Sequence, residues 1–420
     1  MTDERLIRGF VFACTQATEA QCLDRHLLAT EKTYGPVVIR VRKGDLLYLL
    51  NIETDTMHGV FVATSDGDYK LDTSVFGLKY PYQVRVETLG GILKLQNAHR
   101  MLNKLGIKRN TPIYKEKLVD LLEAYAFLNE SETSSIKLLV RDADNPIANK
   151  VKEIQRSRAA VDIEEEIPLI ETTTFWDFPK QSYGLTPKGN NKYAGVTPAL
   201  IIYNMVWRYT DVGELVVDPM CGSGTTLDVC KEERRRAIGY DIVSAREDII
   251  QNDARSIPLD DNSVDMIFID SPYGDNIKYN EHPDNIGNIS CESEKFYDEL
   301  EKVMIESYRI LKDGKVLGWL IGDQWVQKVF TPVGFKVYER LCRHFEPVDL
   351  ICVNRRGQYS NTGVWHNRAR RFNFFLRGFK YLIIVRKVSE KRTEKKSRKI
   401  EWAYYVRGEI KGARRVANDY

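Results

Sequence analysis

The sequence lacks several features that would assign it to familiar classes of protein. Its seven cysteines are odd in number and scattered, and none stands in a C-x-x-C pair. This argues against a disulfide framework or a zinc ribbon and favours a reducing compartment. No apolar run reaches the length of a transmembrane helix, so no membrane partner is expected. Residues 1–5 show no signal-peptide pattern, and together these features predict a cytoplasmic protein.

An excess of charge of one sign is also lacking. The 420 residues include 62 Lys and Arg against 59 Asp and Glu, a net charge of +3. The net charge therefore does not indicate a nucleic-acid partner, and the local distribution of charge is a better guide to one. The histidines are isolated and show no metal-ligand spacing, so no bound metal is expected. The length favours two domains, while the oligomeric state is not defined by the sequence.

Short apolar stretches separated by turn residues dominate the first part of the chain. A helix is predicted over residues 17–28, and strands are predicted at 9–15, 37–41, 45–51, 58–64 and 81–86. Helical periodicity over 92–127 predicts two amphipathic helices. Residues 129–167 carry alternating charges and little continuous apolar surface. We therefore interpret 91–170 as a helical segment followed by a charged linker that itself contains a helix.

The first 90 residues resemble the PUA-like superfamily of small β-barrels, and within it the plant-type DCD and prokaryotic EVE branches. The residues that carry the resemblance are 9–12, 43–49, 59–67, 75–77 and 82–86. Members of this superfamily often bind RNA or a modified base. The resemblance therefore implies an accessory nucleic-acid-binding domain over residues 1–90, and a barrel with a scaffolding or protein-binding role is the alternative.

Two stretches of the second domain, predicted over 171–388, carry the chemistry. The apolar strand 215–218 ends in an acid and is followed by a small, glycine-containing turn that opens a helix. The apolar strand 266–270 ends in Asp270 and is followed by Ser-Pro-Tyr. Strand, turn and helix alternate here, which predicts an α/β fold with a mostly parallel sheet and helices on both faces. Both acids then lie at the carboxyl edge of the sheet, where such folds bind ligands.

The turn after residue 218 lacks the usual phosphate-binding patterns. No Gly-Lys-Ser or Gly-Lys-Thr follows, and Leu227 stands where the third glycine of G-x-G-x-x-G would fall. A small-residue turn still lets a ligand approach the backbone at a helix N-terminus. Asp241, at the end of the next predicted strand, can hydrogen-bond a ribose diol. Asp253 places a polar side chain at a third strand end, so the sequence predicts a nucleoside site without a phosphate requirement.

These residues resemble the class I S-adenosylmethionine-dependent methyltransferases, with a Rossmann-like sheet. More narrowly, roughly residues 172–386 are similar to the DNA methyltransferases that act at N6 of adenine or N4 of cytosine. Thr197-Pro198, expected as the cap and first residue of a helix, matches the helix motif that precedes the cofactor loop. The resemblance implies S-adenosylmethionine as the cofactor and a binding set of Thr197, Pro198, Asp218, Pro219, Met220, Cys221, Gly222, Ser223, Gly224, Thr225, Asp241 and Asp253.

The four residues Asp270, Ser271, Pro272 and Tyr273 match the catalytic tetrad of these enzymes, usually Asp/Asn/Ser-Pro-Pro-Tyr, with serine in place of the first proline. An exocyclic base nitrogen is a poor nucleophile because its lone pair is conjugated with the ring. Asp270 would accept one N–H and the carbonyl of Ser271 the other, so that the lone pair faces the sulfonium methyl. Pro272 would stiffen the backbone, and Tyr273 would stack on the flipped-out base. A β-turn with an incidental aromatic is the alternative.

Basic, amide and aromatic side chains interleave from residue 354 to 371, which we predict to be a target-contacting loop. Arginine can contact phosphate or guanine, amides can contact adenine and aromatics can stack. A solvated basic loop is the alternative. The tail 389–420 is rich in Lys and Arg and would add phosphate affinity or only solubility. The predicted nucleic-acid contacts are Arg355, Arg356, Gln358, Asn361, Trp365, His366, Arg368, Arg370 and Arg371.

Three functions are compatible with these observations. The leading hypothesis is a site-specific DNA amino-methyltransferase, for which the leading Asp270 favours adenine N6 over cytosine N4. The second is an RNA methyltransferase acting on a guanine or adenine amino group, since a tetrad followed by glycine (here Gly274) and a PUA-like domain both occur on RNA enzymes. The third is a noncatalytic nucleic-acid reader, against which the intact Asp218, Asp241 and Tyr273 argue. The first hypothesis allows a restriction-endonuclease partner, which the sequence does not define.

Overall fold

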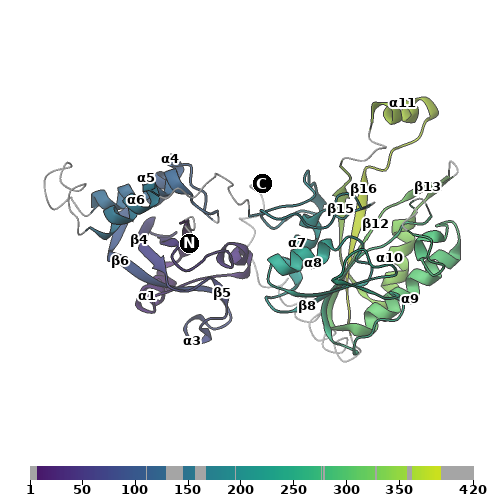
Figure 1. Cartoon of the computed structure of the whole chain (residues 1–420), viewed down its shortest axis with the longest axis horizontal. Helices are drawn as coiled ribbons and strands as arrows, with labels where there is room; N and C mark the ends of the chain where they lie inside the picture. Colours follow the sequence, from purple (N-terminus) through teal and green to yellow (C-terminus); the bar gives the residue numbers. More distant parts are fainter. Residues whose placement is uncertain are drawn as a thin grey trace, which may run out of the picture. The chain divides into compact units, whose positions relative to one another are not determined.

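The protein is described from a computed structural model, which divides the chain into two compact units. The first comprises Met1–Ile170 with Tyr183–Pro187, and the second comprises Glu171–Ser182 with Lys188–Tyr420. Figure 1 shows both, and each is described by itself. The predicted contacts Gln358 and Asn361 and the tail 389–420 lie outside the described residues. These are 7–109, 111–128, 145–156, 167–193, 195–275, 277, 280–326, 329–356 and 362–388.

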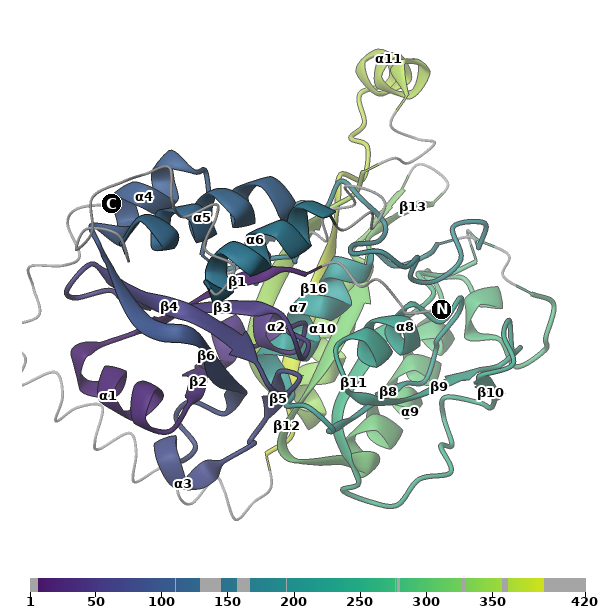
Figure 2. The ribbon, with the colours of Figure 1, turned by 60° about the vertical axis from the view of Figure 1, so that its left-hand side comes forward.

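The described residues of the first unit include six strands that form a small β domain. The strands are β1 (Gly9–Cys14), β2 (Leu27–Thr30), β3 (Leu46–Asn51), β4 (Thr56–Ala63), β5 (Asp68–Tyr69) and β6 (Tyr82–Gln96). Their order is β1-β3-β4-β6-β2, and β5 also pairs with β6. The long strand β6 joins the two parts of the sheet, because residues 82–85 pair with β2 and the residues that follow pair with β4 (Figure 2).

Helices cover one face of this β domain. Figure 2 shows α4, α5 and α6 together above β4 and β6. Tyr125 of α5 is fully buried, its ring centroid lies 5.5 Å from that of Tyr48, and its hydroxyl donates to the carbonyl of Met57 at 2.8 Å. The helices of the unit are α1 (Gln16–Asp24), η1 (Lys32–Tyr34), α2 (Gly35–Val38), α3 (Thr73–Phe76), α4 (Ala98–Lys104), α5 (Lys115–Leu128) and α6 (Pro146–Arg156).

Several expectations for the first unit are wrong in detail. The predicted strand 37–41 begins inside the short helix α2. The helix predicted over 17–28 ends at Asp24, and His26, with a φ of +50°, turns the chain into β2. The helical pattern from residue 92 starts as the end of β6, because Leu93 and Leu95 also share one face of a strand. The linker contains a helix as expected, but this helix, α6, is packed structure, since it places apolar residues in the core of the first unit.

In the second unit, eight strands of the described residues form one sheet in the order β10-β9-β8-β11-β12-β16-β15-β7. The strands from β10 to β12 are parallel, whereas β16 is antiparallel to both its neighbours. The sheet is thus mostly parallel, as predicted, with an antiparallel strand near one edge. The strands are β7 (Phe175–Trp176), β8 (Leu215–Asp218), β9 (Arg236–Asp241), β10 (Ile249–Gln251), β11 (Val264–Asp270), β12 (Leu311–Ile321), β15 (Glu346–Asn354) and β16 (Phe379–Arg386).

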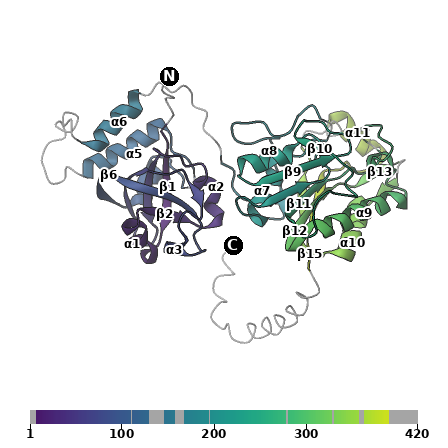
Figure 3. The same cartoon turned by 60° about the horizontal axis from the view of Figure 1, so that its bottom comes forward.

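The sheet is covered on both faces. Figure 3 shows α7 and α8 on one side and α9 and α10 on the other. Strand β11 is almost completely buried between them, which explains the apolar run from Met266 to Ile269. The remaining elements are α7 (Ala199–Tyr209), α8 (Thr225–Glu232), η2 (Ile286–Asn288), α9 (Glu294–Ile310), α10 (Val333–His344), α11 (Gly363–Phe372) and the hairpin β13 (Gln324–Val326) with β14 (Val329–Thr331).

The strand order reverses between β8 and β11. The chain moves outward from β8 through β9 to β10, and then returns to place β11 on the other side of β8. A crevice at the carboxyl ends of the strands is expected at such a reversal. The topology confirms the predicted Rossmann-like sheet and places the loop after Asp218 beside the tetrad that begins at Asp270.

Two boundary predictions in this unit are wrong. Helix α7 begins at Ala199 and Pro198 is its N-cap residue, one position later than expected for each. The predicted loop 354–371 contains helix α11, because residues 364–371 include no glycine or proline to interrupt it. Among the described residues, no helix is both long and apolar enough to cross a membrane.

Candidate active site

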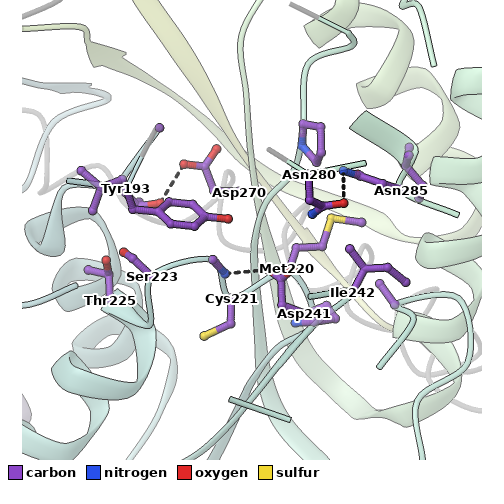
Figure 4. A pocket seen from close by; sticks show the side chains of 18 of the residues that line it. Tyr193, Met220, Cys221, Ser223, Thr225, Asp241, Ile242, Asp270, Asn280 and Asn285 are labelled. Atoms are coloured by element: carbon purple, nitrogen blue, oxygen red, sulfur yellow. Dashed lines mark hydrogen bonds between the residues drawn. The ribbon is translucent and has the colours of Figure 1, made fainter. Parts of the chain in front are cut away.

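The cavity of the second unit lies where β8, β9, β10 and β11 end. It encloses about 810 Å³ of space, part of which is open to solvent. Figure 4 shows the ring of Tyr193 lying between Asp270 and the loop after β8, with Asn280 and Asn285 on the opposite side. The lining residues are Tyr193, Gly195, Val196, Thr197, Pro219, Met220, Cys221, Gly222, Ser223, Thr225, Asp241, Ile242, Asp253, Ala254, Asp270, Pro272, Asn280, Asp284, Asn285 and Ile286.

Asp218, the last residue of β8, fixes the loop that follows this strand. Its side chain is buried, accepts a hydrogen bond from the Thr226 hydroxyl, and accepts another from the backbone N–H of Met220 at 3.1 Å. Burial raises the pKa of Asp218 to about 7, although the two hydrogen bonds oppose that shift. Asp218 does not line the cavity, so its contribution is to fix the loop that does.

Two glycines of this loop have backbone conformations that side chains disfavour. Gly222 has a φ of +52° and Gly224 a φ of +85°. A Cβ on Gly222 would lie 3.1 Å from Tyr193 Cε1, and a Cβ on Gly224 would lie 2.5 Å from an Arg246 guanidinium nitrogen. Glycine therefore allows the loop to turn tightly into α8 between two neighbouring side chains.

Asp241, the last residue of the adjacent strand β9, contacts the same loop. Its Oδ2 accepts from the backbone N–H of Gly222 at 2.8 Å, and Oδ1 accepts from the N–H of Val243 at 3.3 Å. Burial raises the pKa of Asp241, while these backbone donors lower it. The carboxylate lines the cavity and has lone pairs left for a ligand, as a ribose-binding acid requires.

Asp253 lines the cavity at the end of β10. Arg255 donates to it from its side chain at 2.6 and 2.9 Å and from its backbone at 2.9 Å. Burial would raise the pKa of Asp253, but the Arg255 hydrogen bonds outweigh it and the pKa is lowered. This aspartate is consequently held as a carboxylate at the edge of the pocket.

Asp270 is the acid of the tetrad and lines the cavity opposite the loop. The Thr197 hydroxyl donates to its Oδ2 at 2.7 Å, and the Tyr273 hydroxyl donates to its Oδ1 at 3.0 Å. Lys380 of β16 lies 3.2 Å from Oδ2. Protein donors thus hold both carboxylate oxygens in place, and Thr197 joins the predicted helix motif to the predicted catalytic motif.

The other tetrad residues differ in exposure. Pro272 lines the cavity. Ser271 is buried, and its hydroxyl accepts a hydrogen bond from the indole of Trp319 at 2.9 Å. This bond anchors the residue that replaces the first proline of the usual tetrad. The ring of Tyr273 is only 8% exposed and lies beneath the ammonium of Lys380, 5.0 Å from its centroid.

Several residues at the cavity were not among the sequence predictions. Tyr193 and Asn280 lie in loops without a motif, and Asn285 donates to Asn280 Oδ1 at 3.0 Å. Lys380 follows Asp270 by 110 residues and reaches it through the antiparallel strand β16. Its only sequence signal was a lysine at the start of an apolar run, residues 381–385, where a charged residue is uncommon in a buried strand.

The predicted nucleic-acid contacts lie on α11 and the segment before it. Arg356 forms an ion pair with Asp177, whereas Trp365, Arg368, Arg370 and Arg371 are on α11, none of whose residues is buried. The Arg368 guanidinium lies 5.1 Å from the Trp365 ring centroid. His366 also lies on this helix. Among the described residues, no group of three or more His, Cys, Asp or Glu is arranged to hold a metal.

Comparison with known families concerns the first unit. Residues 8–104 match the family model of the development and cell death domain, which confirms the predicted DCD resemblance. The chain is 34% identical over 92 residues to the DCD domain-containing protein NRP-B of Glycine max and 33% identical over 89 residues to the B2 protein of Daucus carota. Each match covers 20% of this chain, and the chain spans 28% and 43% of these two relatives.

Comparison with solved structures finds several methyltransferases that cover under half of this chain. A candidate DNA modification methylase of Thermus thermophilus is 19% identical, with a TM-score of 0.24, over 42% of this chain and 54% of the other. TrmN of Thermus thermophilus is 14% identical, with a TM-score of 0.32, over 46% and 50%. A candidate class I S-adenosylmethionine-dependent methyltransferase of Listeria monocytogenes is 16% identical, with a TM-score of 0.32, over 46% and 59%. These likenesses assign no substrate to this chain.

Proposed function

We propose that the second unit is an S-adenosylmethionine-dependent methyltransferase that methylates an exocyclic amine of a flipped-out DNA base, with adenine N6 favoured over cytosine N4. One observation carries the proposal. Asp270, the acid of the tetrad, lines the same cavity as Asp241 and the loop at Gly222. A nucleoside pocket and an acceptor for an amine therefore share one space.

The charge of the residues that line the cavity suits S-adenosylmethionine. Its lining, among the residues that the structure describes, includes Asp241, Asp253, Asp270 and Asp284 but no lysine or arginine. Such a lining favours a cationic ligand and disfavours one with phosphate groups. S-adenosylmethionine is a cationic nucleoside that supplies an electrophilic methyl group. Asp241 would hold its ribose hydroxyls, and the backbone at Gly222 leaves room for the ligand to approach.

The tetrad would prepare the base nitrogen. Asp270 accepts one N–H of the amine, and the carbonyl of Ser271 accepts the other, which concentrates the lone pair on nitrogen. The bond from Trp319 to the Ser271 hydroxyl restrains this backbone where the usual tetrad has proline. Because Thr197 and Lys380 already hold Asp270, the acceptor is oriented before substrate arrives. The Asp270 carboxylate, which accepts that N–H, would take the proton that the methylated amine releases.

The preference for DNA rests on the resemblance of roughly residues 172–386 to DNA amino-methyltransferases, and the arginines of α11 support binding of a nucleic acid. A helix with no buried residue that presents Arg368, Arg370 and Arg371 is suited to phosphate contacts. The first unit would then be an accessory domain that holds nucleic acid. RNA is the alternative polymer, because the PUA-like resemblance of the first unit is also typical of RNA enzymes.

Label transfer tests the proposal. The full-length chain is incubated with methyl-labelled S-adenosylmethionine and either unmethylated genomic DNA or total RNA, and the labelled polymer is hydrolysed to nucleosides. We expect label in DNA, as N6-methyladenine. Label in RNA alone would overturn the choice of polymer, and N4-methylcytosine would overturn the choice of base. No transfer to either polymer, with the cofactor bound, would overturn the enzymatic proposal.

A further inference from the structure

A surface of aromatic rings and arginines is built from β13–β14, α11 and residues 373–377, and only α11 has a role assigned above. Trp325 and Phe374 are stacked, with ring centroids 6.2 Å apart and planes inclined by 30°. The guanidinium of Arg377 lies 5.9 Å from the Trp325 centroid and 5.1 Å from that of Phe330. We call these elements the aromatic–arginine surface. Three separate segments converge on it, and most of it lies outside the stretch predicted to contact DNA.

The rings of this surface are open to solvent. Phe375 is 81% exposed, Phe372 63%, Phe330 43% and Trp325 40%. Helix α11, which carries Phe372, buries none of its ten residues. A helix this short is marginal in water when nothing packs on it. Exposed apolar groups gathered in one place usually mark a binding site, so the surface is suited to a ligand that covers the rings.

The charge of the surface selects a polyanion. Residues 354–379 contain six arginines and no aspartate or glutamate. Among the described residues, Arg368, Arg371 and Arg377 form no salt bridge, so their charges are available to a ligand. Guanidinium groups beside aromatic rings bind phosphates while the rings stack on bases.

The surface is continuous with the tetrad. Strand β12 ends at Ile321, and a Cβ on the next residue, Gly322, would lie 3.5 Å from Tyr273 Cε2 and 3.7 Å from Lys380 Cγ. The hairpin begins two residues later at Gln324. On the other strand, Arg377 precedes Lys380 by three residues. Both β13 and the segment that carries Arg377 are therefore joined directly to residues that contact the tetrad.

We infer that the aromatic–arginine surface binds unpaired nucleotides that flank the target base, so that the preferred substrate is single-stranded or locally opened DNA. The inference rests on the proposed function and deepens it. In an intact duplex the faces of the bases are covered by their neighbours, and exposed rings such as Phe375 would find nothing to stack on. In a single strand the same faces are free, and stacking is tolerant of sequence.

Binding measurements test the inference. A dye-labelled 30-nucleotide DNA, alone or annealed to its complement, is titrated with the full-length chain at fixed salt, and anisotropy gives Kd. We expect tighter binding of the single strand. Trp325→Ala and Phe375→Ala should each weaken single-strand binding by about fivefold or more and leave duplex binding nearly unchanged. Arg371→Gln should weaken both forms and reduce the salt dependence.

Controls separate stacking from general damage. Ile305→Ala removes an exposed apolar side chain of α9, 51% exposed, and should bind like the wild type. Thermal unfolding of Phe375→Ala checks that the variant is folded. Its Tm should match that of the wild type, because a side chain this exposed contributes little to stability. Equal or tighter binding of the duplex, or wild-type binding by both aromatic variants, would overturn the inference. So would much tighter binding of RNA of the same sequence, or self-association that Phe375→Ala abolishes.

Methyl transfer measured on native and heat-denatured genomic DNA distinguishes this inference from the proposed function. Transfer to heat-denatured DNA that Phe375→Ala weakens supports both. Transfer to native duplex that neither aromatic variant affects overturns the inference and keeps the proposed function. Absence of transfer to every polymer overturns the proposed function, whereas the binding experiment still decides what the surface holds.

Discussion

Lys380 Nζ lies 3.2 Å from Asp270 Oδ2, and the same ammonium lies 5.0 Å from the centroid of the Tyr273 ring. One lysine therefore contacts the first and the last residue of the tetrad. Both partners of the ion pair are nearly buried, with side chains 12% and 11% exposed. Burial lowers the pKa of Lys380, and the neighbouring Asp270 opposes that shift. The pair fixes the carboxylate that is to accept the base amine.

Replacement of this lysine tests that role. Lys380→Met keeps much of the volume and removes the charge, so Asp270 loses a partner and its orientation. We expect kcat to fall by about 10- to 100-fold, because small misplacements of a reacting group have effects of that size. The Kd for S-adenosylmethionine should stay within about twofold. Wild-type kcat in Lys380→Met would contradict a positioning role, and Lys380→Arg should recover part of the activity if charge is what matters.

The cofactor loop allows a second test with a matched control. Gly224 and Gly213 both have positive φ, +85° and +82°. A Cβ on Gly224 would collide with Arg246, whereas a Cβ on Gly213 would meet nothing within 4 Å. Both alanine variants should lose about 1–2 kcal/mol through the backbone. Only Gly224→Ala should also weaken cofactor binding, by about tenfold or more. Equal cofactor Kd values in the two variants would show that this turn does not shape the pocket.

Asp241 supplies a third prediction. Asp241→Asn keeps an acceptor for Gly222 but removes the negative charge. A hydrogen bond to a charged group contributes about 1.5–3 kcal/mol, so the Kd for S-adenosylmethionine should rise by roughly 10- to 100-fold. Isothermal titration calorimetry measures it. Asp260→Asn, at an exposed position of the same unit, serves as the control. An unchanged Kd in Asp241→Asn would remove this residue from the cofactor site.

The raised pKa of Asp218 predicts how stability depends on pH. The folded state keeps a proton up to about pH 7, whereas an ordinary aspartate loses it near 3.8. The contribution of Asp218 to stability is thus greatest below about pH 4 and declines as pH rises to about 7. Asp218→Asn lacks this decline. Relative to wild type, it should gain about 3 kcal/mol of unfolding free energy between pH 5 and pH 8.

Urea denaturation of the full-length chain, with unfolding of the second unit followed at pH 5 and pH 8, checks this prediction. Asp260→Asn is again the control, because its carboxylate is exposed. A constant difference between Asp218→Asn and wild type would mean that Asp218 is ionised throughout. Such a result would contradict the account of this aspartate as a buried residue that holds the loop from behind.

Local patterns predicted the sheet and much of the cavity. Alternating strands, turns and helices define a parallel sheet, and acids at strand ends fall at one edge because the strands run in one direction. Asp241, Asp253 and Asp270 could be placed by that reasoning alone. The start of the helical segment in the first unit could not be predicted in this way, because Leu93 and Leu95 suit a strand as well as a helix.

Contacts between distant segments were beyond such reasoning. The pairing of Lys380 with Asp270 depends on the antiparallel strand β16, whose direction and register follow from tertiary packing. The same is true of Trp325 and Phe374, which stack across a hairpin and a loop separated by 49 positions. Aromatic residues scattered over the sequence gave no sign that they gather on one surface.

Asp270→Ala provides the most direct test of the central claim, when methyl transfer to DNA and S-adenosylmethionine binding are measured on the same preparation. The claim is that Asp270 activates the base amine and leaves the cofactor to other residues. It predicts that transfer is abolished while the cofactor Kd changes little. Substantial transfer by Asp270→Ala, or loss of transfer only in proportion to lost cofactor binding, would contradict it.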